Sequence, residues 1–277
     1  MKSSARSIRR RLKTVSSIGQ LSRAMKTVAV SKYNRASACL AAMRPYRRQC
    51  RHLMETAGIP GVSPGPEAKA VCYVVLTANR GLSGSYNTEI WNLMESTLRA
   101  EKRPCSLVLA GRWGEARMGA DKPGQLRRVF TISDIPTREE ADSLARFLWD
   151  TWQEGQVQEI SFISQRFHNI LHQTPAIRQV LPIPSLPGRG EDTLFVPGQE
   201  QIVQDLIFRS LRADVHEIML GAMAGAHGAM LMAMRTAMDN AQAMHAQLER
   251  TLNRLRQTAV TTEVLELSRA WGEEQEK

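Results

Sequence analysis

The fold is decided by a stretch near the C-terminal end of this 277-residue sequence, where residues 211–259 read LRADVHEIMLGAMAGAHGAMLMAMRTAMDNAQAMHAQLERTLNRLRQTA. Its apolar side chains recur at steps of three or four, as on one face of an α-helix. No proline occurs between Gly198 and Lys277. A helix of about 70 residues spans on the order of 105 Å, whereas a compact chain of this length has a radius of gyration of only about 19 Å. A periodic segment this long predicts a coiled coil.

The N-terminal end carries a second helical pattern. Its apolar stripe consists of Ile8, Leu12, Val15, Ile18, Leu21, Met25, Val28, Ala36, Cys39 and Met43. Lys32 interrupts this stripe once, and no proline precedes Pro45. Two long helices at opposite ends of a chain pair most simply with each other. We therefore predict an antiparallel coiled coil formed by residues 1–57 and residues 198–277.

Three glycines lie inside the C-terminal pattern, at Gly221, Gly225 and Gly228. Glycine lacks a Cβ atom, so each can bend the helix or let a neighbouring element approach closely. The same region is rich in methionine, which we interpret as pliable core filling.

Between the two ends, the pattern changes to alternating strands and helices. A linker rich in glycine and proline covers residues 58–66. We expect strands at residues 71–76, 106–110, 126–132, 157–167 and 177–183, with helices at residues 88–100 and 138–154. Such alternation predicts a mostly parallel sheet with helices on its faces. The predicted fold class is α/β, with a Rossmann-like α/β domain (residues 67–197) inserted between the arms of the coiled coil.

The positive charge is confined to one segment. The chain has 37 Lys and Arg against 27 Asp and Glu, a formal charge of +10. Residues 1–54 contain 14 of the basic residues and no acidic one, so the rest of the chain is slightly acidic. This block predicts an acidic partner, which could be nucleic acid, an anionic membrane surface or an acidic protein face. From the residues alone, a coiled-coil protein that binds nucleic acid through this basic helix remains an alternative.

The other motifs indicate no catalytic, cofactor-binding or metal site. The four cysteines form no CxxC pair, and we expect them to be buried, reduced thiols. The segment Thr77–Asn87 joins a strand to a helix, where phosphates often bind. It matches neither glycine-rich phosphate fingerprint and lacks their lysine, so we interpret it as a structural turn. The uncharged run from Ile218 to Met234 is short for a membrane span, so we expect no direct membrane insertion.

Three separated segments resemble the gamma subunit of F-type ATP synthase. The first is IRRRLKTVSSIGQ at residues 8–20, continued by AMKTVAVSK at residues 24–32. The second is LTANRGLSGSYN at residues 76–87. The third combines AMDNA at residues 237–241 with NRLRQTAVTTE at residues 253–263. These segments follow the order of that family over essentially the full length of the chain.

The resemblance implies a central-stalk rotor subunit, which couples ion-driven rotation to ATP synthesis or hydrolysis at the alpha and beta subunits. Its further partners would be the epsilon subunit and the membrane rotor ring of c subunits. The subunit itself would be non-catalytic, with no cofactor and no nucleic acid bound. It would lie at the cytoplasmic face of the cell membrane as a peripheral protein, in a complex that translocates protons or sodium ions.

The resemblance also implies which residues contact the ring of alpha and beta subunits. Met25 and Lys26 would lie near an acidic lever segment of the beta subunits. Arg9, Arg10 and Arg11 would face the same acidic surface, here called the acidic collar. A second, hydrogen-bonding contact with the ring, here called the catch, would be formed by Arg256, Gln257, Thr261 and Glu263.

The sequence departs from the family at three positions. Asn79 replaces the usual Asp, Ser83 replaces the usual Cys, and Val196 stands where a carboxylate normally precedes the last helix. The C-terminal tail is charged instead of small and apolar. These departures suggest a divergent gamma subunit, of the kind encoded in an alternative operon.

Overall fold

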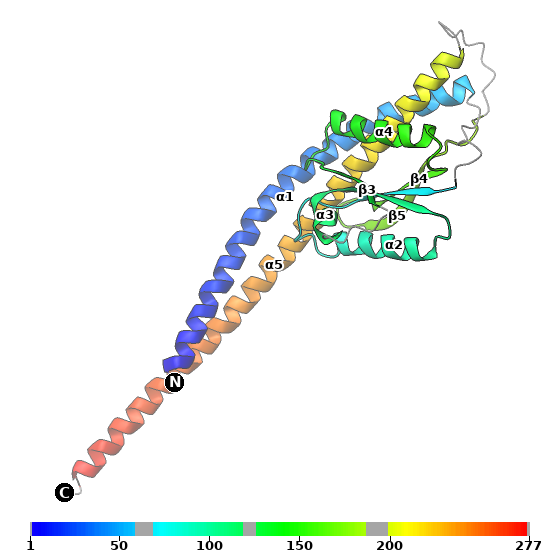
Figure 1. Ribbon diagram of the computed structural model, residues 1–277. Helices are drawn as coiled ribbons and strands as arrows, with labels where there is room; N and C mark the ends of the chain where they lie inside the picture. Colours follow the sequence, from blue (N-terminus) through cyan, green and yellow to red (C-terminus); the bar gives the residue numbers. More distant parts are fainter. Residues whose placement is uncertain (1, 59–68, 119–125, 187–198, 276–277) are drawn as a thin grey trace. The chain divides into compact units, whose positions relative to one another are not determined.

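The computed structural model describes residues 2–58, 69–118, 126–186 and 199–275. The chain divides into two units. The helical unit consists of Met1–Val28 and Met232–Lys277, and the α/β unit consists of Ala29–Leu231. The two long helices α1 (Lys2–Ala57) and α5 (Gln199–Gln275) contribute residues to both units (Figure 1). Helix α1 continues through Pro45, whose ring is exposed to solvent.

The α/β unit is built on a five-stranded sheet with the order β3-β2-β1-β4-β5. Its strands are β1 (Val71–Leu76), β2 (Cys105–Ala110), β3 (Leu126–Phe130), β4 (Glu159–Phe167) and β5 (Gln173–Leu181). The first four are parallel, and β5 pairs antiparallel with β4. The parallel strands are connected by α2 (Tyr86–Ala100), α3 (Arg112–Met118) and α4 (Arg138–Gln153).

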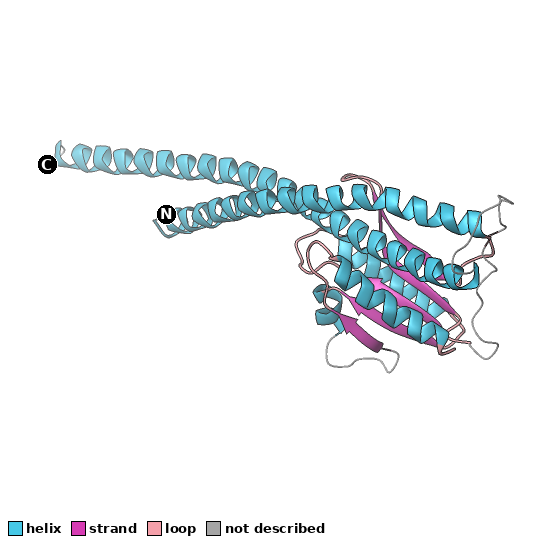
Figure 2. Cartoon of the chain, turned by 90° about the horizontal axis from the view of Figure 1, so that it is seen from above, coloured by secondary structure: helices cyan, strands magenta, loops and turns pink. Residues whose placement is uncertain are grey.

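Helices cover both faces of this sheet (Figure 2). Side chains of β1 alternate between the faces, as the geometry of a strand requires. Cys72 and Leu76 pack in the same cluster as α4 and the middle of α5, whereas Tyr73 and Val75 pack with α2. Every residue of β1 is buried, which is typical of a central parallel strand. The predicted fold class is confirmed, although α3 was not expected because it is only seven residues long.

The middle of α5 serves as a core helix of the α/β unit. Leu211, Val215, Ile218 and Met223 belong to the buried cluster on the α4 side of the sheet. One window within Ile202–Thr262 is long and apolar enough to cross a membrane, but 67% of it is buried inside the protein. The apolar side chains of this window therefore pack mainly against other parts of the same chain.

Two of the three glycines in α5 allow a close approach. A Cβ atom on Gly225 would lie 3.2 Å from the Tyr86 ring and 3.1 Å from the Gln173 amide oxygen. A Cβ atom on Gly228 would lie 3.2 Å from the Gln173 amide nitrogen. Nothing lies within 4 Å of such an atom on Gly221, so a close approach is found at Gly225 and Gly228 but not at Gly221.

Two expectations about buried side chains are wrong. All four cysteines are free thiols, but Cys39 is exposed and Cys105 is only half-buried. In the apolar stripe of α1, Val15 is buried, whereas Leu21 is 60% exposed and Val28 is 49% exposed. The stripe was expected to pack against the partner helix along its whole width. One partner helix covers only part of that width, so the remaining apolar side chains stay exposed to solvent.

Candidate contact surface of the terminal helices

The helical unit brings together the N-terminal part of α1 and the C-terminal part of α5. Small residues pack against each other where the helices meet, because a Cβ atom on Gly19 would lie 3.7 Å from the Cβ atom of Ala241. Val15 and Ser22, one turn to either side of Gly19, are also buried. The two segments run antiparallel in this unit (Figure 1).

A groove of about 730 Å³ runs between these two segments. It is lined by Ser7, Arg10, Arg11, Thr14, Val15, Ile18, Met244, Gln247, Leu248 and Thr251. Ile18 is 48% exposed and Met244 is 53% exposed, so the groove has an apolar floor open to solvent beside two guanidinium groups. Exposed apolar groups beside polar ones are typical of a protein contact surface.

The predicted contact residues lie at the surface of this unit. Exposed are Arg9, Arg10, Arg11, Arg256, Gln257 and Thr261, while Met25 and Lys26 are half-buried. The Thr261 hydroxyl donates a hydrogen bond of 3.0 Å to the Gln257 backbone oxygen, one turn earlier in α5. Gln257 and Thr261 therefore share one face of the helix. Glu263 belongs to α5, but its side chain lies outside the described part of the chain.

The structure does not bring all these residues to one place. Gly19 faces Ala241, and the helices run in opposite directions from that point. At 1.5 Å per residue, Lys26 lies about 10 Å from this point in one direction, and Arg256 lies about 23 Å from it in the other. Met25 and Lys26 therefore lie at one level and the expected catch at another, roughly 30 Å apart on one pair of helices. Arg9, Arg10 and Arg11 lie about 12–15 Å from Gly19 on the Arg256 side, so they are closer to the catch.

Sequence reasoning missed the exposed apolar residues of this unit. Val260, Val264 and Leu265 are each more than half exposed near the end of α5, and Leu21 is similarly exposed on α1. The signal was present in the sequence, because an apolar pattern that continues along a helix beyond its partner's reach predicts a second contact surface.

The turn Thr77–Asn87 in the α/β unit uses its polar groups internally. The Thr77 hydroxyl accepts a hydrogen bond from the Gly114 backbone N–H at 2.9 Å. The Asn87 amide oxygen accepts one from the Ala78 N–H, also at 2.9 Å. A Cβ atom on Gly111 would lie 2.1 Å from the Thr77 oxygen, so the residue after β1 and the residue before α3 are in direct backbone contact. These contacts agree with a structural turn.

Asp134, in the segment after β3, connects this turn to both long helices. It forms an ion pair with Lys32 of α1, and the Asn79 amide donates to its Oδ1 at 3.2 Å. His227 of α5 lies 2.8 Å, by its Nε2 atom, from the Asp134 backbone oxygen. Burial raises the pKa of Asp134, but the hydrogen bonds from Lys32 and Asn79 outweigh that effect and lower it overall. Asparagine at position 79 suits this site, because its amide can donate to Asp134 whereas a carboxylate would repel it.

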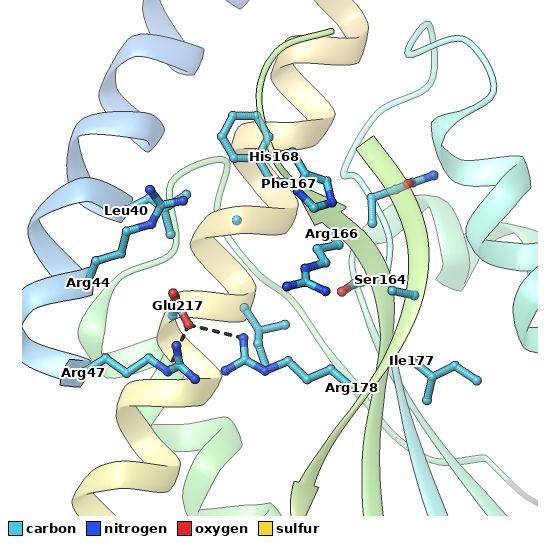
Figure 3. Close-up of a pocket in the computed structure, with 14 residues that line it drawn as sticks. Leu40, Arg44, Arg47, Ser164, Arg166, Phe167, His168, Ile177, Arg178 and Glu217 are labelled. Atoms are coloured by element: carbon cyan, nitrogen blue, oxygen red, sulfur yellow. Dashed lines mark hydrogen bonds and ion pairs between the residues drawn. The ribbon is translucent and has the colours of Figure 1, made fainter. Parts of the chain in front are cut away.

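A second network fastens β5 to both long helices (Figure 3). Arg178 of β5 contacts Asp214 at 2.6 Å and Glu217 at 3.2 Å, both on α5. Arg47 of α1 contacts the same two carboxylates. Burial lowers the pKa of Arg47, but the charges of Asp214 and Glu217 together with the hydrogen bond to Asp214 raise it overall.

Comparison with known proteins identifies related chains. A family model described as ATP synthase matches residues 4–270. The ATP synthase gamma chain of Moorella thermoacetica is 35% identical over 272 residues, which cover 95% of this chain and 96% of that one. The ATP synthase gamma chain of Symbiobacterium thermophilum is 32% identical and covers 96% of this chain, with 97% of its own length matched.

Solved structures share the fold. The rotor of the Euglena gracilis mitochondrial ATP synthase in rotational state 1 gives a TM-score of 0.68 at 17% identity, covering 94% of this chain and 100% of that chain. The central stalk and c-ring structure from the Tetrahymena thermophila mitochondrial ATP synthase gives a TM-score of 0.61, also at 17% identity, covering 78% of this chain and 99% of that one. Sequence and fold agree along nearly the whole length, and the chain belongs to the ATP synthase gamma chain family.

Proposed function

We propose that this chain is the central-stalk rotor subunit of an F-type ATP synthase. The observation that carries this proposal is the similarity to ATP synthase gamma chains over nearly the full length of both partners. In this role the chain couples ion-driven rotation to ATP synthesis or hydrolysis by the alpha and beta subunits. The comparisons give no support to the alternative of a nucleic-acid-binding coiled-coil protein.

The helical unit is the part that turns inside the ring of alpha and beta subunits. Its two contact levels, one at Met25 and Lys26, the other at Arg256–Glu263 with Arg9–Arg11 on the same side, lie on helices whose faces differ in charge and apolar exposure. Each beta subunit therefore meets a different face and is stabilised in a different conformation. Rotation moves these contacts from one beta subunit to the next, and the difference in contact free energy couples the shaft to the nucleotide sites.

The α/β unit passes torque to the long helices. Several side-chain connections fasten the sheet and its loops to α1 and α5 within this unit. Among them are the Lys32–Asp134 ion pair, the network of Arg47, Arg178, Asp214 and Glu217, and the 2.5 Å hydrogen bond from the Tyr86 hydroxyl to the Ala222 oxygen. Contacts of this unit with the c-ring and the epsilon subunit would drive both helices through these connections. Val196, where the family normally has a carboxylate, lies outside the described residues.

The subunit itself is non-catalytic in this proposal. In support, two side chains of the turn that most resembles a phosphate-binding loop accept hydrogen bonds from backbone N–H groups of the protein itself, Asn87 from Ala78 and Thr77 from Gly114 of α3. The protein is peripheral and is held at the cytoplasmic face of the cell membrane through its partners. The division into residues 1–57, 67–197 and 198–277 likewise remains a proposal about its domains.

Co-purification tests this function. The full chain, expressed with the alpha and beta subunits from the same genome, is expected to elute with them as one complex with ATPase activity. A well-folded chain that elutes separately under the same conditions would contradict the proposal. A matched sample without the chain gives the ATPase activity of the alpha and beta subunits alone.

A further inference from the structure

The α/β unit contains a pocket that no role in rotation explains. It encloses about 600 Å³ and is lined by α1, by the hairpin of β4 and β5, and by α5. Figure 3 shows Arg44 and Arg47 reaching toward it from α1, and Arg166 and Arg178 from the two strands. Four arginines thus surround one space, although they lie far apart in the sequence.

The positive charge of this pocket is not neutralised. Glu217 is the only acidic residue among the described residues that line it. Together with Asp214, it is already shared between Arg47 and Arg178. In the described part of the chain, neither Arg44 nor Arg166 forms an ion pair. The pocket therefore keeps two guanidinium groups, those of Arg44 and Arg166, that have no carboxylate partner among the described residues.

Two of the arginines are preorganised. Asp214 and Glu217 hold Arg47 and Arg178 from the α5 side, so an incoming anion need not order these side chains. Guanidinium groups bind phosphate oxygens with paired, charge-assisted hydrogen bonds. A concave site in which one sign of charge predominates also raises the local concentration of ions of the opposite sign.

The walls of the pocket set the size and kind of ligand. Leu40 and Ile218 form buried apolar walls, and Ser164 adds a hydroxyl. Gly221 presents no side chain, which leaves open space on α5. A volume of this size is in the range of small-molecule sites and exceeds what a single phosphate ion fills.

We propose that this pocket binds a small, multiply charged phosphate compound, with Arg44 and Arg166 as its principal ligands. Bound there, the compound bridges α1, the hairpin and α5, and stabilises the α/β unit. This site is separate from the contact surface of the helical unit and does not depend on the proposed rotor function.

The test is calorimetric titration of the full chain with inorganic pyrophosphate at low salt. Saturable binding of one pyrophosphate per chain is expected. The double variant Arg44→Gln with Arg166→Gln should bind roughly tenfold more weakly or worse, because it loses two charge-assisted contacts. Pyrophosphate should also raise the melting temperature of the natural chain, and raise it less in this variant.

The matched control is Arg35→Gln with Arg48→Gln. Both residues are exposed on α1 outside the pocket lining, and their removal lowers the net charge equally. The control is expected to retain its affinity within about twofold. Absence of saturable binding by the natural chain, or an equal loss of affinity in both double variants, would overturn the proposal. Far-ultraviolet circular dichroism checks that all variants are folded.

Discussion

Lys32 of α1 forms an ion pair with Asp134, which lies 102 residues later in the chain, in the segment that follows β3. This pairing explains the one charged residue in the apolar stripe of α1. At position 32 the stripe faces not a helix but a loop at the carboxyl end of the sheet. There, a carboxylate, the Asn79 amide and His227 meet.

The first prediction concerns the pH dependence of this contact. Because the folded pKa of Asp134 is lowered from 3.8, its contribution to stability is present above that value and is lost as the pH falls through the folded pKa. Asp134→Asn should therefore lower the free energy of unfolding by about 1 kcal/mol at neutral pH. The difference from the natural chain should shrink as the pH falls below about 4 and vanish once the pH lies below the folded pKa of Asp134. Urea unfolding of the natural chain and the variant at several pH values measures this free-energy difference and its pH dependence. A difference that does not change with pH would refute the stabilising role of the Asp134 carboxylate.

The second prediction compares two glycines of α5. Gly225→Ala should destabilise the fold by about 1–3 kcal/mol, because the new methyl group meets the buried Tyr86 ring at 3.2 Å. That ring cannot easily move, since its hydroxyl is bonded to the Ala222 oxygen. Gly221→Ala is the matched control in the same helix, with nothing within 4 Å, and should stabilise the protein by up to about 1 kcal/mol. Thermal unfolding of both variants checks the sign, and equal shifts would contradict the packing argument.

The third prediction concerns the catch. Arg256→Ala with Gln257→Ala should lower ATP synthesis or hydrolysis by the assembled complex roughly fivefold or more. The melting temperature of the isolated chain should stay nearly unchanged, because both side chains are exposed. Arg112→Ala with Gln153→Ala removes the same two residue types from exposed positions of the α/β unit and should leave turnover intact. Natural turnover in the first double variant would remove Arg256 and Gln257 from the proposed contact.

The fourth prediction concerns the basic start of α1. Replacement of Arg9, Arg10 and Arg11 by glutamine should weaken association with the alpha and beta subunits roughly tenfold at low salt. The difference should shrink at about 1 M salt, where the screening length falls to about 3 Å. Interferometry with the immobilised chain measures the affinity for the alpha and beta subunits at both salt concentrations. Duplex DNA of mixed sequence is the second ligand, and strong, salt-sensitive binding of it would favour the nucleic-acid alternative instead.

The sequence was sufficient to predict β1 and β2 closely because these strands carry continuous apolar runs. Polar residues interrupt β5, which begins at Gln173, four residues before the expected start. Val71–Leu76 was predicted without error at either end, and its six residues are buried on both faces of the sheet. The predicted contact residues proved mostly exposed, and none of the charged ones whose side chains the structure describes forms an ion pair with another described residue. Their roles against other subunits remain predictions, because a single chain does not contain the surfaces they would meet.

By itself, the sequence determined two long helices, an α/β insertion and an excess of positive charge at one end, because helical period, apolar runs and charge are local properties. Only the tertiary structure decided which face of each helix is covered. Leu21 belongs to the same stripe as Val15, yet Val15 is buried and Leu21 is 60% exposed. Only the tertiary structure brought Arg44, Arg47, Arg166 and Arg178 around one pocket. The physical reason is that burial and electrostatic environment depend on contacts between distant segments, which no local pattern contains.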